Sequence, residues 1–142
     1  MKRLMLILAV GIMMGGSLSS CSSKKTFGDL LIELETNMGW NSVNQAWRDR
    51  RDGWIKDVNS ASTSKDKAKL MMEFENMVLW SAVNPTWAEE RSQWLSATEN
   101  AENEKQLGSC LMKFESYVLW DVVSPNWKDR RTGWIDDCKK LE

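Results

Sequence analysis

The sequence contains no histidine, and this absence removes the commonest general base and metal ligand at neutral pH. It also has no glycine-rich phosphate loop, no cysteine nucleophile with a base beside it and no cluster with metal-ligand spacing. Its adjacent carboxylates, Glu89-Glu90 and Asp136-Asp137, are typical of solvated helix faces. We therefore predict that the protein is not an enzyme and has no catalytic residue, no metal site and no cofactor.

Helix breakers and an excess of one charge are also scarce. Pro85 and Pro125 are the only prolines, and β-branched residues are few, so we expect helices throughout the mature chain. Without residues 1–20, which include Lys2 and Arg3, 17 basic residues face 20 acidic ones, a net charge of −3. This balance argues against nucleic acid or an acidic lipid surface as the partner.

The N-terminal segment has the pattern of a secretory signal peptide. Lys2 and Arg3 form a short positive region, and an apolar stretch from Leu4 to about Leu18 follows. A membrane-spanning helix needs about 20 apolar residues, and this stretch is shorter and interrupted by glycine. We predict that residues 1–20 are a signal peptide and are not part of the fold.

The end of this segment, Leu18-Ser19-Ser20-Cys21, resembles the lipobox of bacterial lipoproteins. The resemblance implies cleavage before Cys21, lipidation of Cys21, and a lipidated tether over residues 21–28 that holds the chain on a membrane of the cell envelope. Ser22 stands where an aspartate favours inner-membrane retention in enteric-type bacteria, so the outer membrane is the favoured location. Ordinary secretion and an uncleaved anchor are the alternatives.

Tryptophan is abundant, and it marks a repeat. All nine tryptophans fall in triplets spaced by seven residues, and the triplets recur every 40 residues within the pattern Glu-x4-Trp-x2-Val-x3-Trp-x3-Arg-x2-Trp. A period near 40 is typical of helical repeats. The shared positions, apart from the valines, are Glu35, Trp40, Trp47, Arg51 and Trp54; Glu75, Trp80, Trp87, Arg91 and Trp94; and Glu115, Trp120, Trp127, Arg131 and Trp134.

Each copy reads as a helix, a tight turn and a second helix. Apolar residues at three- and four-residue spacing predict the first helices, one of which begins near Ser64. Asn84-Pro85 and Ser124-Pro125 combine a capping side chain with a proline suited to the first helical position. The second helices are predicted at 45–58, 85–97 and 125–139.

The predicted fold is therefore all-α. Residues 26–142 form one helical domain of three helix-turn-helix repeats, which cover 29–62, 63–102 and 103–142. The sequence leaves open whether the repeats stack as a short solenoid or close into a six-helix bundle.

Cys110 and Cys138 lie 14 residues before and after Ser124. Two antiparallel helices that turn at this serine would bring the cysteines face to face, and an exported protein meets oxidising conditions. We therefore predict a Cys110–Cys138 disulfide.

The Trp–Glu–Arg motif has two interpretations. Arg51 lies one helical turn from both Trp47 and Trp54, so its guanidinium is expected between the indoles, with Glu35 holding it through two hydrogen bonds. We favour a structural role in the core of each repeat, because the motif recurs in every copy whereas a binding site usually occurs once. The alternative is a binding surface for sugar rings or cations.

These patterns favour a non-catalytic, lipid-anchored module that binds another protein in the cell envelope, with the charged faces of the second helices as the candidate surface. One alternative is a lipoprotein that binds a glycan or small ligand through exposed tryptophans. Another is an immunity or inhibitor lipoprotein directed against one envelope enzyme or toxin.

Overall fold

The computed structural model describes residues 23–142, so the predicted signal peptide and Cys21 lie outside the described residues. This part of the chain is helical, which confirms the all-α prediction. Within it, no helix has the length and apolar character that crossing a membrane requires. The elements are α1 (Phe27–Met38), η1 (Trp40–Ser42), α2 (Ala46–Ser60), α3 (Ser64–Met77), α4 (Trp80–Val83), α5 (Trp87–Glu99), α6 (Glu104–Tyr117), α7 (Trp120–Val123), η2 (Pro125–Trp127) and α8 (Lys128–Lys139).

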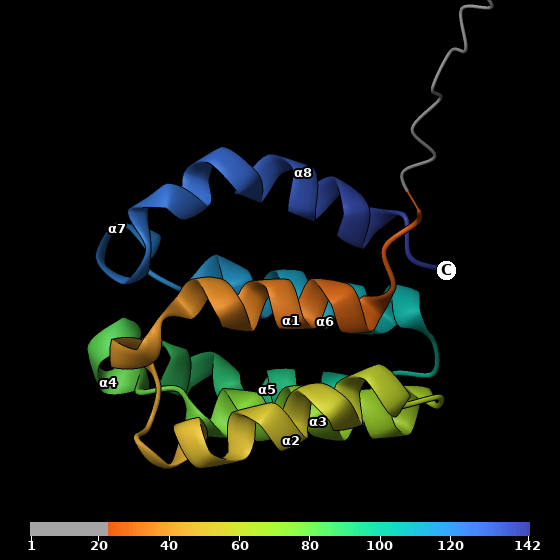
Figure 1. The fold of residues 1–142 in the computed structure, drawn as a ribbon, viewed down its shortest axis with the longest axis horizontal. Coiled ribbons are helices and arrows are strands. Elements are labelled where there is room, and N and C mark those ends of the chain that lie inside the picture. Colours follow the sequence, from red (N-terminus) through yellow and green to blue (C-terminus); the bar gives the residue numbers. More distant parts are fainter. Residues whose placement is uncertain (1–22) are drawn as a thin grey trace, which may run out of the picture.

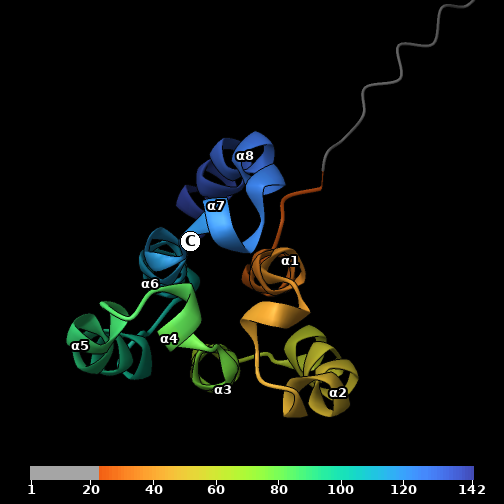
Figure 2. The same ribbon diagram turned by 90° about the vertical axis from the view of Figure 1, so that its left-hand side faces the viewer.

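The three repeats close into a bundle with approximate threefold symmetry. Their first helices, α1, α3 and α6, contact one another at the centre, and the second helices, α2, α5 and α8, pack around them (Figure 2). Each outer helix contacts the inner helix of its own repeat and that of the next repeat. Because α8 packs against α1, the third repeat meets the first, and the open solenoid is ruled out for this structure.

The inner helices begin at side-chain caps. Thr26 accepts a hydrogen bond from the Asp29 backbone N–H, and Asp29 reciprocates in a capping box. Thr63 and Asn103 cap α3 and α6 by accepting from the backbone N–H groups of Asp66 and Gln106. The predicted start of α3 near Ser64 is confirmed, but the residue that caps it is Thr63 and not Ser64.

The connection between the helices is more than the predicted tight turn. A short helical turn precedes each second helix and begins at the first tryptophan of the triplet, namely at Trp40, Trp80 and Trp120. The predicted capping at Asn84 and Ser124 is wrong: α5 begins at Trp87 after Thr86, and Ser124 makes no side-chain capping bond. Asn84 Oδ1 instead accepts from the Thr86 backbone N–H at 3.1 Å within the turn that precedes α5. In the second and third repeats, this extra turn places the first tryptophan of the triplet against the second.

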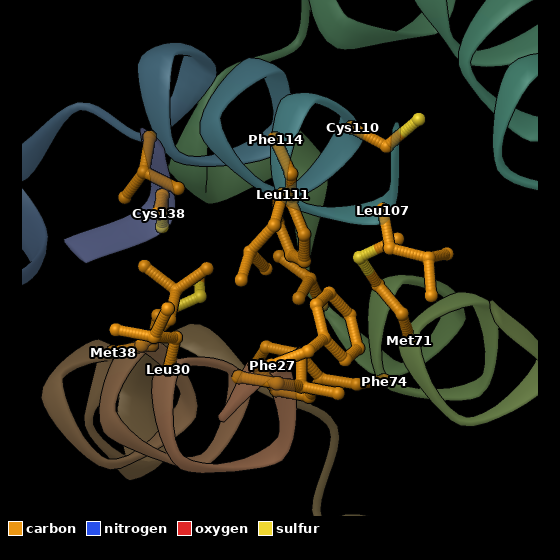
Figure 3. Packing of buried hydrophobic residues seen from close by; sticks show 14 of the residues in the cluster. Phe27, Leu30, Met38, Met71, Phe74, Leu107, Cys110, Leu111, Phe114 and Cys138 are labelled. Carbon is orange, nitrogen blue, oxygen red and sulfur yellow. The ribbon is translucent and has the colours of Figure 1, made fainter. Parts of the chain in front are cut away.

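The centre of the bundle is filled by the apolar faces that the spacing predicted. Phe27, Leu30, Leu111 and Phe114 are among the fully or almost fully buried residues that meet between the inner helices (Figure 3). The Phe114 ring lies 5.7 Å from that of Phe74, so aromatic contacts join α3 to α6.

The two ends of the bundle differ. Residues 23–26 and the C-terminus lie together at one end, where Lys24 forms an ion pair with Glu142 at 2.7 Å; we call this the terminal end (Figure 1). The short turns η1, α4 and α7 lie together at the other end, which we call the turn end (Figure 1, Figure 2). Any ligand-binding residue that the turns contribute therefore lies at the opposite end of the bundle from residues 23–26 (Figure 1).

Candidate functional site: the tryptophan clusters and the turn end

Each repeat contains a buried carboxylate that joins the two helices. In the second repeat, Glu75 accepts hydrogen bonds from Trp87 Nε1 at 2.8 Å and from Arg91 Nε and Nη2 at 2.8 and 2.9 Å. Glu75 is fully buried, whereas the Arg91 side chain is 38% exposed. The same bonds recur at Glu35 with Trp47 and Arg51, and at Glu115 with Trp127 and Arg131.

The electrostatics of these clusters suit a structural role. The hydrogen bond to Glu75 raises the pKa of Arg91 above its ordinary value, and partial burial opposes this only in part. Both oxygens of Glu75 already accept bonds from neighbouring donors. Since the carboxylate is enclosed and paired, it fixes the second helix on the first and is not placed to exchange a proton with a substrate.

The second and third tryptophans of each triplet belong to the core. All six are at most 3% exposed. Each third tryptophan donates its indole N–H to a backbone carbonyl of the following repeat: Trp54 to Leu70, Trp94 to Cys110, and Trp134 to Leu30, the last at 3.0 Å. The spacing of seven therefore places one indole on the repeat's own glutamate and the next on the neighbouring repeat, which supports the core interpretation.

The predicted position of the arginine between the two indoles is wrong. Trp47 and Trp54 contact each other directly, edge to face, with ring centroids 5.1 Å apart. Arg51 instead lies beside Glu35, with its guanidinium carbon 5.6 Å from the ring of Trp40. The two-pronged bond to the glutamate was predicted correctly, because residue spacing on two helices determines it.

The first tryptophans are where the copies differ. Trp80 stacks on Trp87 at 4.7 Å, and Trp120 stacks on Trp127 at 4.9 Å. Both also donate to the backbone carbonyl of the glutamate in their own repeat. Trp40 makes neither contact with the described residues and is 45% exposed.

The predicted disulfide is not present: Cys110 and Cys138 are both free and buried. Cys110 faces Thr98 of α5, while Cys138 lies against the backbone of α6 near Gly108, and the two side chains point in different directions (Figure 3). Burial raises the pKa of both thiols, that of Cys138 to about 12. The prediction failed because residue 110 packs against the preceding repeat, not against the second helix of its own.

The turn end carries the apolar surface that sequence analysis missed. The large hydrophobic side chains that the structure leaves exposed between residues 23 and 142 are Trp40, Leu79, Leu119 and Val122, and all lie on or beside the short turns. A hollow of about 560 Å³ lies beside α7, between Val118–Val122 and the side chains of Lys128 and Arg131. The only signal in the sequence was the Val-Leu-Trp run at 78–80 and 118–120, which extends the apolar pattern past the helix ends.

Part of the charged outer surface, our original candidate, is occupied by contacts within the protein. Arg50 of α2 binds Glu73 of α3 and Asp57 of its own helix. Lys113 of α6 pairs with Glu90 of α5. These exposed pairs bridge neighbouring helices, so they help to set helix orientation and leave fewer charges for a partner.

Residues 22–79 match a family described as a domain of unknown function (DUF8799), a span that includes α1, η1, α2 and α3. No curated protein and no solved structure gives a significant match. Across residues 23–142, no group of three or more acidic or cysteine side chains is arranged to hold a metal ion.

Proposed function

We propose that this protein is a non-catalytic, lipid-anchored module of the cell envelope that binds a protein partner through its turn end. The observation that carries the proposal is the location of the exposed apolar side chains. Leu79, Leu119 and Val122 are 39%, 50% and 74% exposed, and they lie at one end of a bundle whose other hydrophobic residues are mainly buried. Exposed apolar patches of this kind often mark interaction sites.

The buried tryptophans support a protein partner over a glycan. A sugar ring stacks on an accessible indole face, and eight of the nine indoles are packed inside or partly covered. Aliphatic side chains such as Leu119 and Val122 suit the apolar residues of another protein, since their burial needs no specific stacking geometry. The glycan alternative depends on Trp40 alone.

The predicted lipid anchor and the turn end would lie at opposite ends of the bundle. A lipid on Cys21 would hold the terminal end close to the membrane, because residue 23 enters the bundle there. α3 has 14 residues, which corresponds to about 20 Å of helix. The turn end would therefore face away from the membrane, about one bundle length further out, where a soluble or membrane-bound partner can reach it.

A site-specific crosslinking experiment tests this proposal. A photoreactive amino acid is placed at Val122 in the full chain, and at Ser92 as a control, which is exposed on the flank of α5. We expect a discrete crosslinked product on live cells from position 122 and none from position 92. Equal products from both positions, or none from position 122, would contradict binding through the turn end.

The identity of the crosslinked partner also separates the remaining alternative. A single secreted enzyme or toxin would favour an immunity or inhibitor lipoprotein, in which the same surface blocks the target. A protein that is a permanent component of the cell envelope would instead favour the protein-interaction module.

A further inference from the structure

The first repeat departs from the other two at its turn. Gly39 takes the position of Leu79 and Leu119, and it adopts φ +66°, in the left-handed region that favours glycine. A side chain there would meet open space, with no atom within 4 Å of a Cβ. Trp40 follows directly and is the exposed member of the first tryptophans, so the departure uncovers an indole that the other copies cover.

Two arginines stand beside this indole. The guanidinium carbons of Arg48 and Arg51 lie 5.4 and 5.6 Å from the centre of the Trp40 ring, a cation–π distance. Arg51 is held by Glu35 through Nε and Nη2. Arg48 takes part in none of the ion pairs found between residues 23 and 142.

Comparison across the repeats shows that an unpaired cation at this position is specific to the first repeat. The position of Arg48 is occupied by Ala88 in the second repeat and by Lys128 in the third. Lys128 pairs with Asp121, so its charge is already balanced by a neighbour. An exposed, unpaired guanidinium beside an exposed indole therefore occurs in one repeat of three.

The dimensions of the site favour a side chain over a larger ligand. A hollow of about 160 Å³ lies among Glu35, Thr36, Gly39, Trp40, Val43 and Arg51. Pockets for drug-sized ligands are usually about 300–1,000 Å³. A hollow below this range accommodates one side chain of a peptide and is small for a sugar residue with its substituents.

An apolar surface continues from the hollow. The Leu79 backbone N–H donates to the Ser42 carbonyl at 3.0 Å, and Val43 forms an antiparallel bridge with Val78. These bonds hold the exposed Leu79 side chain next to the η1 turn. A ligand that enters the hollow would therefore meet an aliphatic surface beside a cationic and aromatic one.

We propose that this site binds an acidic residue of the protein partner, with Arg48 pairing with its carboxylate and Trp40 and Leu79 covering the apolar residues beside it. The inference rests on the proposed function, since it assigns the chemistry of the partner that meets the turn end. Arginine suits the role because its planar fork binds a carboxylate through two hydrogen bonds. The partner segment is thus an acidic residue flanked by Leu, Ile, Val or Phe.

Peptide selection on the full chain provides the test. A phage library of random dodecapeptides is panned against the detergent-solubilised lipoprotein, and recovered peptides are measured by fluorescence anisotropy with wild type and variants. We expect enrichment of Asp or Glu beside apolar residues, and binding at least about tenfold weaker to Arg48→Ala, as typical of a lost charged hydrogen bond. Lys128→Ala, which removes a cation at the equivalent position of the third repeat, should bind within about twofold of wild type.

The controls separate this inference from the proposed function. Arg48→Ala introduces the residue that the second repeat has naturally, so we expect it to fold, and an unchanged melting curve checks this. Peptides without acidic enrichment, or acidic peptides that bind Arg48→Ala as well as wild type, overturn the inference. If those peptides still lose binding to Val122→Asp, the turn end remains the binding surface and only the role of Arg48 is wrong.

A final arm addresses acidic sugars. Glucuronic acid and N-acetylmuramic acid are added as competitors, because they carry a carboxylate on a ring that could stack on Trp40. We expect no displacement of the peptide at millimolar concentration. Displacement by either sugar, absent with the neutral sugar N-acetylglucosamine, would overturn the peptide assignment in favour of a glycan.

Discussion

Replacing Glu75 by alanine should destabilise the fold more than any ordinary surface change. The substitution leaves the N–H of the fully buried Trp87 without an acceptor, which costs about 1–3 kcal/mol. It also breaks the pair with Arg91, but that side chain is 38% exposed and water can replace the lost bonds, so this adds only about 1 kcal/mol. The free energy of unfolding should therefore fall by about 2–4 kcal/mol.

Thermal unfolding of the chain without residues 1–20, with Cys21→Ser, measures this loss. For a domain of roughly 120 residues, 1 kcal/mol corresponds to about 4 °C, so Glu75→Ala should lower Tm by about 8–16 °C. Arg91→Ala should also lower Tm, because it leaves a buried carboxylate with a single donor. Glu89→Ala is the matched control, since Glu89 is exposed on the same helix, α5, and should shift Tm by less than about 2 °C.

Equal melting temperatures for Glu75→Ala and Glu89→Ala would refute the reasoning. They would mean that the indole N–H of Trp87 does not need the Glu75 carboxylate as its acceptor, or that the helices separate enough for a water molecule to replace it. Urea unfolding with an unchanged m-value would confirm that the variants differ in stability and not in the extent of their unfolded state.

Four further outcomes are expected. The tryptophan emission of the native chain should be blue-shifted and weakly quenched by acrylamide; a red-shifted, readily quenched spectrum would contradict the buried clusters. Cys110 and Cys138 should resist thiol reagents at pH 8 until the chain is unfolded, because their raised pKa values keep them protonated, and reductant should leave Tm unchanged. Gly108→Val should lower the free energy of unfolding by about 1–3 kcal/mol, because its Cβ would lie 3.1 Å from a backbone carbonyl oxygen. Gly133→Ala should raise it by about 0.5–1 kcal/mol, because the added Cβ has no atom within 4 Å. Similar melting temperatures for the two variants would contradict this. Cells fed radiolabelled palmitate should label the wild-type chain in the outer-membrane fraction but not Cys21→Ser, and equal labelling would reject the lipobox assignment.

The elements of the candidate site were predictable to different degrees. The bond between Arg51 and Glu35 followed from spacing, because both positions are fixed on regular helices and repeat in every copy. The exposure of Trp40 did not follow, since its motif position is the same as that of Trp80. Its different environment depends on the backbone conformation of Gly39 and on which neighbours the short turn reaches.

The way in which the repeats pack on one another could not be predicted from the sequence pattern either. A period of 40 residues specifies that similar hairpins pack in succession, but the rotation from one hairpin to the next determines whether they form an open stack or a ring. The same rotation placed Cys110 against Thr98 of the preceding repeat and so separated it from Cys138.

The sequence by itself determined the helical class and the three repeats, because these depend on residue spacing along helices. It favoured the inward role of most tryptophans, because large apolar side chains gain most from burial, but it left exposed indoles as an alternative. Only the tertiary structure decided that Trp134 bonds to Leu30 and closes the bundle, and that the exposed apolar residues gather at the turn end. The physical reason is that a side chain's neighbours across a repeat boundary depend on how whole helices pack. Local spacing constrains the hairpin but leaves that packing undetermined.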